Sequence, residues 1–197
     1  EEEMKEKGYL AGSFMANSFN SLRANDLIWS FFVKNYLQGK KPVPFDILYW
    51  NADSTNMPCT MHSQYLRWMY LHNNLIKPGK ISLNKTPLDV SQIDTPSFFL
   101  STQKDHIAPW KTTYIGFQAF KGPKRFVMGG SGHIAGIINP AGSEKYGYHT
   151  NNNAPKNPDD WYDGAKEHRG SWWPEWGKWL KEHSGKLIKA ADITKLP

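Results

Sequence analysis

The chain has 197 residues, of which 39% are hydrophobic and 21% charged, with one cysteine and a formal net charge of +6 at pH 7. This composition is too apolar for a disordered chain, and no stretch approaches the roughly 18–20 unbroken apolar residues of a membrane-spanning helix. A single cysteine excludes an internal disulfide framework and a cysteine-based zinc cluster, so we expect a reducing cytoplasm. The lysines are scattered and no nucleic-acid-binding motif occurs, so no nucleic-acid partner is expected.

Two helices are predicted in the first part of the chain. Asn25, or the aspartate after it, can cap a helix that runs to about Leu37 and ends at Gly39. The residues expected on its buried side are Leu27, Ile28, Phe31 and Phe32. A second helix fits residues 63–76, because apolar side chains recur there at helical spacing, and Pro78 would stop it.

Strands and helices alternate after a change of texture at residues 77–79. Residues 97–102 predict a short apolar strand, Pro109 suits the first turn of a helix that runs to about residue 120, and residues 125–128 predict a second strand. Strand, helix and strand at this spacing indicate a parallel βαβ unit in an α/β sheet.

The end of the chain predicts one irregular segment and one helix. Residues 146–170 contain three consecutive asparagines and two prolines, which argue against regular structure and favour a surface excursion. From Ser171 onward, tryptophans recur at helical spacing and predict an amphipathic helix.

Two polar residues lie just past the predicted strands, where open α/β sheets bind their ligands. Asp105 follows the first strand, and His133 follows the second in the glycine-rich loop 129–133. An acid and then a histidine form the second half of the nucleophile–acid–histidine order of α/β-hydrolases. The carboxylate would fix the tautomer of an imidazole that takes a proton from a nucleophile. Asp105 could instead form a turn or cap the helix at Pro109, and His133 could be structural or merely exposed.

No nucleophile for this pair is found in the sequence. The strand-to-helix elbow needs G-x-S-x-G or a close variant, and Gly8 and Gly12 have the right separation but enclose Leu10. Ser131 precedes His133 by only two residues, and Cys59 has no elbow pattern, so we expect an incidental thiol. Metal and nucleotide motifs are also missing, and the sequence predicts His62 and His72 at the surface or as caps.

Four stretches, in order along nearly the whole chain, strongly resemble the polyhydroxyalkanoate synthases. They are FDILYWNADSTNMP at 45–58, KDHIAPW at 104–110, SGHIAGIINP at 131–140 and EHRGSWWP at 167–174. The resemblance is best to the class I type, which polymerises short-chain 3-hydroxyacyl-CoA. It implies a partial α/β-hydrolase fold, with residues 1–77 forming part of the helical cap and residues 78–197 the C-terminal part of the core.

The resemblance also implies roles for individual residues. Asp105 and His133 fall on the family's catalytic aspartate and histidine, whereas Cys59 does not fall on its nucleophile, a cysteine in a G-x-C-x-G elbow expected upstream of this chain. His133 would help to form the thiolate that attacks the acyl-CoA thioester, and Asp105 would activate the 3-hydroxyl group or orient His133. His106 matches a family histidine beside the acid, which implies either an orienting role or contact with substrate.

The partners implied are (R)-3-hydroxyacyl-CoA, the growing polyester and the granule surface in the cytoplasm. No cofactor is implied, because the substrate is itself a CoA thioester. Family members pair through the cap, so a homodimer is expected, and residues 27–36 and Trp50 are candidates either for its interface or for plain cap core. The isolated chain should be inactive. Two alternatives remain, an α/β-hydrolase esterase or polyester depolymerase, and a non-catalytic module for granule binding or dimerisation.

Overall fold

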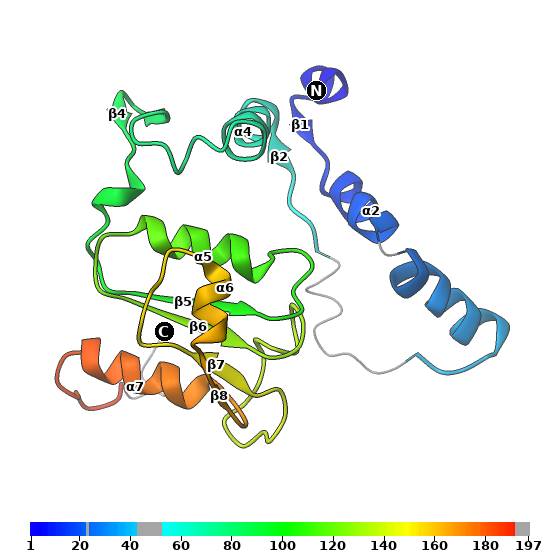
Figure 1. The fold of residues 1–197 in the computed structure, drawn as a ribbon. Coiled ribbons are helices and arrows are strands. Elements are labelled where there is room, and N and C mark those ends of the chain that lie inside the picture. The colour runs from blue at the N-terminus through cyan, green and yellow to red at the C-terminus, as the bar shows by residue number, and fades with distance from the viewer. Residues whose placement is uncertain (23, 43–52, 192–197) are drawn as a thin grey trace. The chain divides into compact units, whose positions relative to one another are not determined.

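The computed structural model describes residues 1–22, 24–42 and 53–191 (Figure 1). The chain divides into two compact units, Glu1–Asn74 and Leu75–Pro197. The division lies close to the predicted boundary after residue 77, while the assignment of the first part to a cap and of the second part to a hydrolase core stays a prediction.

The first unit is mainly helical. Its elements are α1 (Glu2–Lys7), β1 (Tyr9–Leu10), α2 (Gly12–Leu22), the π-helical runs η1 (Asn25–Trp29) and η2 (Phe32–Leu37), β2 (Met57–Pro58), α4 (Cys59–Tyr65) and the π-helical η3 (Leu66–Leu71). β1 pairs with β2 in an antiparallel ladder, and the Gly12 N–H donates to Asn56 Oδ1 over 3.0 Å. These two contacts join segments that lie far apart in the sequence.

The helix predicted from Asn25 to Leu37 is present as η1 and η2, but the prediction of a buried side is wrong. Ile28, Phe31 and Phe32 are all exposed, and the side chain of Leu27 lies outside the described residues. The neighbouring Trp29, Val33 and Tyr36 are exposed as well, so the segment presents a large exposed apolar surface. The described part of the first unit does not cover this surface, and exposed apolar surfaces of this kind are typical of interaction sites.

The helix predicted at residues 63–76 is wrong at both ends. It begins at Cys59, because Pro58 holds an extended conformation with ψ 134° directly before it, and it ends at Leu71. Asn73 follows with φ 45°, in the left-handed region that ends helices, so Pro78 plays no part in stopping it.

The second unit contains an α/β sheet. Its elements are β3 (Ser82–Leu83), β4 (Thr86–Pro87), the 3-10 turn η4 (Val90–Gln92), β5 (Ser97–Thr102), α5 (Trp110–Ala119), β6 (Lys124–Gly129), β7 (Tyr148–Thr150), α6 (Pro158–Asp163), β8 (Lys166–His168) and α7 (Trp173–His183). The main sheet has the strand order β5-β6-β7-β8. β5 and β6 run parallel, whereas β7 is antiparallel to both of its neighbours.

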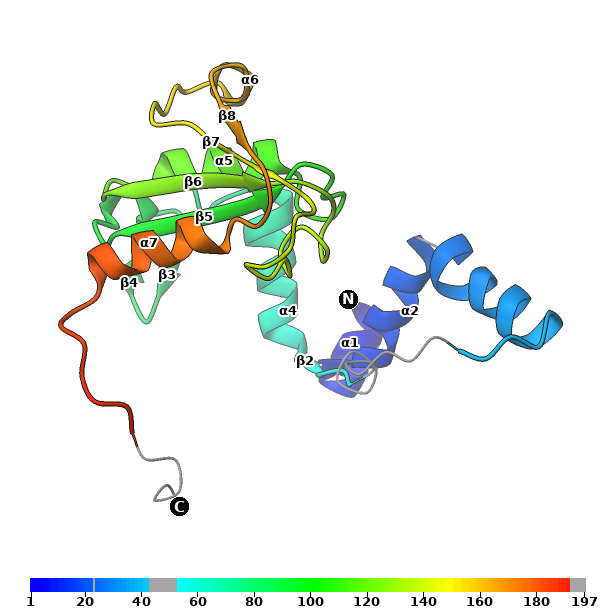
Figure 2. The same ribbon diagram turned by 90° about the horizontal axis from the view of Figure 1, so that it is seen from below.

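The predicted βαβ unit is confirmed. β5 has the predicted bounds, β6 extends the predicted strand by one residue at each end, and α5 lies between them in the chain. Figure 2 shows α5 and α7 on opposite faces of this sheet. On the α5 face, five buried side chains form the core, namely Tyr114, Phe117, Phe126, Met128 and Trp161. Phe126 meets the rings of Tyr114 and Trp161 edge to face, with centroids 5.0 Å away in both cases.

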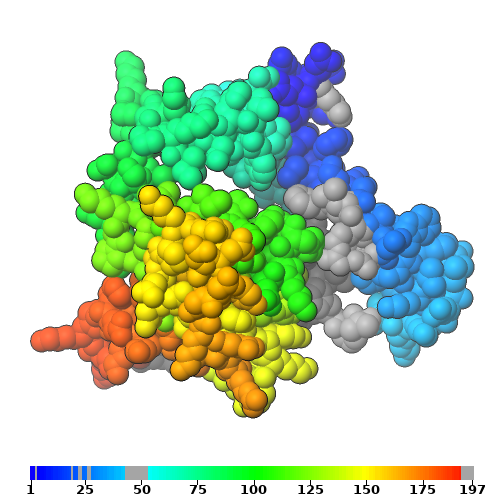
Figure 3. Space-filling model, viewed as in Figure 1, coloured from blue at the N-terminus to red at the C-terminus, as the bar shows by residue number. Residues whose placement is uncertain are grey.

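The prediction that residues 146–170 form an irregular surface excursion is wrong. The segment contains β7, α6 and β8, and the side chain of Trp161 is 1% exposed. In the space-filling view the segment, yellow to orange, covers part of the second unit (Figure 3). Its asparagines and prolines start and shape elements instead of breaking them, since Asn157 caps α6 by accepting from the Asp159 N–H over 3.0 Å and Pro158 opens that helix.

On the opposite face, α7 is fixed to the sheet by aromatic and charged contacts. Phe98 of β5 lies with its ring centroid 5.5 Å from Trp179, and Arg125 of β6 forms a 2.6 Å ion pair with Glu175. The helix predicted from Ser171 begins at Trp173, where the Ser171 hydroxyl accepts a hydrogen bond from the Trp173 N–H over 3.0 Å.

Candidate active site

Two loops leave the carboxyl ends of β5 and β6 side by side. The Gln103 N–H donates to Gly129 O and the Lys104 N–H donates to Ser131 O, each over 2.9 Å. These bonds continue the β5–β6 ladder beyond the last paired residues of the strands. The loop that carries Asp105 is therefore held against the loop that leads to His133.

Asp105 and His133 meet at this edge of the sheet. The Nδ1 atom of His133 lies 2.8 Å from Oδ2 of Asp105, across 28 residues of sequence. The Asp105 side chain is 7% exposed, whereas the His133 side chain is 47% exposed. The carboxylate is thus shielded from water while the imidazole stays open to a reacting group. The structure brings together the two residues that the sequence singled out.

The second carboxylate oxygen of Asp105 shapes its own loop. Oδ1 accepts hydrogen bonds from the backbone N–H groups of Ile107 and Ala108, both over 2.9 Å. Asp105 therefore forms a turn, as its alternative interpretation from the sequence expected, but the turn lies before α5 and does not cap that helix. One carboxylate closes a turn with one oxygen and contacts the imidazole with the other.

Burial of Asp105 raises the pKa of its carboxyl group. Hydrogen bonds from the Ala108 N–H, from the His133 ring and from the Ile107 N–H together outweigh this burial, so the pKa of Asp105 lies below its ordinary value. Asp105 is ionised at neutral pH. An ionised carboxylate favours the tautomer in which Nδ1–H donates to it, and this leaves the other ring nitrogen of His133 free to act as a base.

Glycines allow the His133 loop to fold tightly against the end of β5. A Cβ atom at Gly136 would collide with Gly130 O and lie 2.6 Å from Cγ2 of Thr102. Ser131 adopts φ 66°, in the left-handed region, directly before the Gly132–His133 step. The small residues of this loop therefore permit close backbone packing beside the histidine.

Three other candidate residues do not take part in the Asp105–His133 contact. His106 is exposed on the Asp105 loop, so its contact with substrate stays a prediction. Cys59 opens α4 in the first unit, where its N–H donates to Gly8 O over 3.0 Å. The prediction that His62 lies at the surface or caps a helix is wrong, because its side chain faces inward from α4, 6% exposed, and its Nδ1 has no hydrogen-bond partner among the described residues. Sequence analysis placed the start of this helix at residue 63, after His62, and therefore missed that His62 faces inward.

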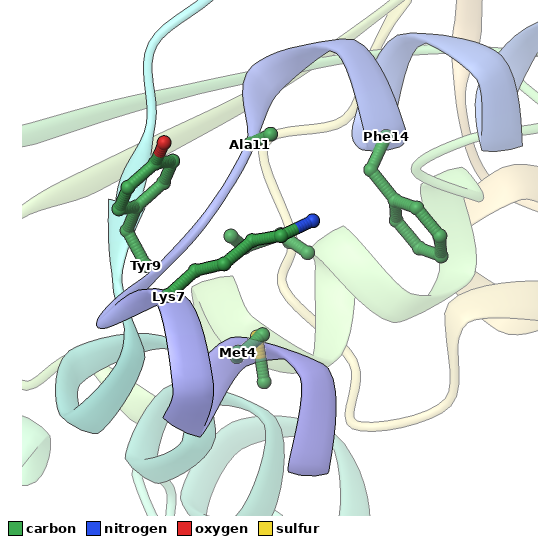
Figure 4. Close-up of a pocket in the computed structure, with 6 residues that line it drawn as sticks. Met4, Lys7, Tyr9, Ala11 and Phe14 are labelled. Carbon is green, nitrogen blue, oxygen red and sulfur yellow. The ribbon is translucent and has the colours of Figure 1, made fainter.

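The described residues offer few other sites. Across residues 1–22, 24–42 and 53–191, no three His, Cys, Asp or Glu side chains gather closely enough to hold a metal ion. In the same ranges no helix combines the length and apolarity that crossing a membrane requires. The first unit has a shallow hollow beside Met4, Tyr9 and Phe14 (Figure 4). Its volume of about 30 Å³ has room for about one water molecule, which is too little for an acyl substrate.

Comparison with known proteins adds the family context. Residues 5–140 match the family model of the alpha/beta hydrolase fold. The chain is 50% identical over 191 residues to the poly(3-hydroxyalkanoate) polymerase of Methylorubrum extorquens, covering 96% of this chain and 31% of that protein. It is 46% identical over 176 residues to the poly(3-hydroxyalkanoate) polymerase subunit PhaC of Cupriavidus necator, covering 89% and 30%. The chain therefore spans about a third of the length of the curated relatives it matches.

Proposed function

The chain belongs to the α/β-hydrolase fold family, and from this premise we propose that it is the part of a polyhydroxyalkanoate synthase that supplies the catalytic histidine and aspartate. The proposed reaction joins 3-hydroxyacyl groups from (R)-3-hydroxyacyl-CoA into a polyester and releases CoA. One observation carries the proposal, namely the 2.8 Å contact between Asp105 and His133 beyond the carboxyl ends of β5 and β6. The identity of 50% to a protein named as a poly(3-hydroxyalkanoate) polymerase supports the choice of reaction.

In the proposed mechanism His133 is the base and Asp105 its orienting partner. His133 removes a proton from a cysteine thiol that a segment outside these 197 residues contributes, because the thiolate is the reactive form. The thiolate attacks the thioester carbonyl, the bond from that carbonyl to the CoA sulfur breaks, and the CoA sulfur takes the proton back from His133. The 3-hydroxyl of one acyl group then gives its proton to His133 and attacks the carbonyl of another acyl thioester. The ester bond forms as the C–S bond of that thioester breaks, and the departing sulfur takes the proton from His133.

Asp105 assists both steps through its charge. Its carboxylate is ionised and in contact with the imidazole, so it offsets the positive charge that His133 gains with each proton. The carboxylate stays in place because its other oxygen is bound by the Ile107 and Ala108 N–H groups. Preorganisation of this kind lowers the barrier without further movement of the protein.

Release of CoA from 3-hydroxybutyryl-CoA tests the proposal. In the full-length protein, the His133→Ala variant should lose nearly all CoA release and polymer formation. Cys59→Ser is the matched control and should keep both, because Cys59 lies in the first unit at the start of α4 and is not the proposed nucleophile. The isolated 197-residue chain should release no CoA. Retained turnover in His133→Ala, or turnover by the isolated chain, would contradict the proposal.

The same assay separates the alternatives. Hydrolysis of polyester or of simple esters without polymer growth would favour an esterase or depolymerase. Binding to polymer granules with no turnover in the full-length protein would favour a non-catalytic module. Each result differs from CoA release coupled to polymer growth, which the proposed synthase requires.

We further infer that the protein forms a homodimer and works at the granule surface in the cytoplasm. The support is the exposed apolar stretch of η1 and η2, which carries Trp29, Phe32 and Tyr36. Phe32 stacks on Tyr36 with ring centroids 5.2 Å apart, so these rings form one apolar surface. Trp50, the other candidate for this interface, lies outside the described residues. A single sedimenting species of monomer mass would contradict the dimer.

A further inference from the structure

Three consecutive residues at the start of α7 donate side-chain hydrogen bonds to the loop that follows His133. Trp172 Nε1–H donates to Gly136 O over 3.0 Å, and Trp173 Nε1–H donates to Ile137 O over 3.1 Å. The Ser171 hydroxyl donates to Asn139 O. We call Ser171, Trp172 and Trp173 the carbonyl clamp. It joins segments that are 32 to 36 residues apart in the sequence.

The clamped carbonyls belong to the same short turn as the histidine. The Gly136 N–H donates to Gly132 O over 3.0 Å, and the Ile138 N–H donates to Ile134 O over 2.9 Å. These two bonds enclose His133 and the residues after it in about one helical turn. Gly136 is bonded back to Gly132, the residue before His133, so the position of Gly136 and Ile137 restricts the position of the His133 backbone.

Two of the three clamp residues are buried, and Trp173 is half-buried. Trp172 is 8% exposed, and Ser171 and Asn139 are buried as well. The Asn139 amide Nδ2 donates to Lys145 O over 2.9 Å, which holds the far side of the turn. Gly136 is buried, so loss of the Trp172 N–H leaves Gly136 O unpaired, whereas Ile137 O also accepts from the Asn139 N–H over 3.0 Å.

The clamp also connects the loop after His133 to β5, the strand that leads to Asp105. The Trp172 ring stacks on Phe98 of β5, with centroids 6.3 Å apart. β5 ends at Thr102, and the Asp105 N–H donates back to Thr102 O over 3.2 Å. Both members of the Asp105–His133 pair are therefore located against β5, one through the end of the strand and the other through the Trp172 indole.

We propose that Trp172 and Trp173 are positioning residues for His133, because their indole N–H groups hold the turn that carries it where the imidazole meets Asp105. This inference rests on the proposed function of the pair. His133 is half-exposed, so the position of its loop largely decides where its ring lies. A displacement of about 1 Å in a catalytic group can cost about 100-fold in rate.

Trp172→Phe and Trp173→Phe test the clamp, because each keeps most of the aromatic body and removes the N–H donor. In the protein as its own gene encodes it, each should lower kcat for 3-hydroxybutyryl-CoA by about 10- to 100-fold and change KM little. Trp176→Phe is the matched control. It removes the same atoms from the same helix, at a side chain that is 41% exposed and has no described hydrogen bond to the loop, and kcat should stay near the wild-type value.

A second measurement separates positioning from a general loss of folding. In protein labelled with ¹⁵N-histidine, the Nδ1 proton of His133 should exchange with water faster in both clamp variants, while the other histidine signals keep their wild-type exchange. If Trp172→Phe does not fold, the less buried Trp173→Phe decides the question alone. Equal kcat and unchanged exchange in Trp173→Phe and Trp176→Phe would overturn the clamp.

The two proposals can fail separately. If His133→Ala keeps full activity, the proposed function fails, while the exchange of the His133 Nδ1 proton still tests the clamp. If His133→Ala is inactive but the clamp variants match wild type in both kcat and exchange, only the clamp fails.

Discussion

Asp105 divides its carboxylate between two tasks, with Oδ2 2.8 Å from Nδ1 of His133 and Oδ1 bound by the N–H groups of Ile107 and Ala108. The first contact requires a negative charge facing the imidazole. The second requires only an acceptor oxygen. A neutral residue of the same shape can therefore keep one task and lose the other.

Asp105→Asn should abolish activity without unfolding the protein. The amide oxygen can still accept from Ile107 and Ala108, so the turn should persist. The neutral amide cannot offset charge on His133, and its NH₂ group favours the wrong tautomer. We expect a fall in kcat of about 10⁴-fold, measured as CoA release, with a melting temperature near that of wild type.

Asp105→Ala is the comparison for this variant, because it removes the acceptor of the turn as well. It should be equally inactive and less stable by about 1–3 kcal/mol, since two backbone N–H groups lose their partner. If Asp105→Asn kept wild-type activity, the charge of Asp105 would have no catalytic part.

The stability of the second unit should fall in mild acid through His168. Its Nε2 is 2.8 Å from Thr150 Oγ1, and its ring stacks on Tyr148. Burial first, and then the charge of Lys166, lower the pKa of His168 below its ordinary value. The folded protein binds a proton there less readily than the unfolded chain, so the stabilisation is present above the ordinary histidine pKa of about 6.5 and is lost as pH falls below it.

Urea unfolding midpoints at about pH 7.5 and 5.5, on either side of the ordinary histidine pKa, measure this effect. The wild-type midpoint should drop more between the two values than that of His168→Gln, which cannot be protonated. Equal drops in the two proteins would mean that His168 does not contribute.

Gly136→Ala should destabilise the second unit and displace the His133 loop. The new methyl group would collide with Gly130 O and crowd Thr102, and neither backbone nor strand end can move away freely. We expect a loss of about 1–3 kcal/mol in unfolding free energy together with a lower kcat. Gly142→Ala is the control, because nothing lies within 4 Å of its Cβ position, and it should be close to neutral.

Trp161→Ala should cost about 3–5 kcal/mol of unfolding free energy, as other buried large-to-small aromatic changes do. The side chain contacts Tyr114 and Phe126 in the core beneath α5. The exposed Trp176 provides the contrast, and Trp176→Ala should change stability by less than about 1 kcal/mol. Similar losses in the two variants, measured by denaturant unfolding, would contradict a core role for residues 146–170.

Gly116→Ala in α5 should stabilise the protein by about 0.5–1 kcal/mol. Its Cβ position has no atom within 4 Å, so alanine lowers the entropy of the unfolded chain and adds no clash. Gly177→Ala in α7 has the same open surroundings and should act alike. A lower melting temperature in both variants would show that α5 and α7 need the backbone conformational freedom of glycine at these positions.

The parts that could be predicted from the sequence depend on short-range signals. The apolar run of β5 and Pro109 before α5 identify their elements locally, and strand order then brings Asp105 and His133 to one edge. The exposure of η1 and η2 could not be predicted, because burial depends on a partner surface. The capping role of Asn157 was missed because asparagine favours both loops and helix starts.

The carbonyl clamp could not be predicted from the sequence either. Ser171, Trp172 and Trp173 lie 32 to 36 residues from the carbonyls that they bind, and those partners are backbone atoms that every residue type carries. The helical spacing of the tryptophans predicted α7 but gave no sign of what lies against their N–H groups. A signal of this kind appears only once the fold is known.

β5 stands at the end of the main sheet and pairs, among the described residues, only with β6. Its other flank presents a row of backbone donors and acceptors between half-buried apolar side chains such as Phe98 and Phe99. A strand in this position acts as a template for one more parallel strand. Open edges of this kind favour edge-to-edge association, so a further strand that paired with β5 would also protect the chain against self-association.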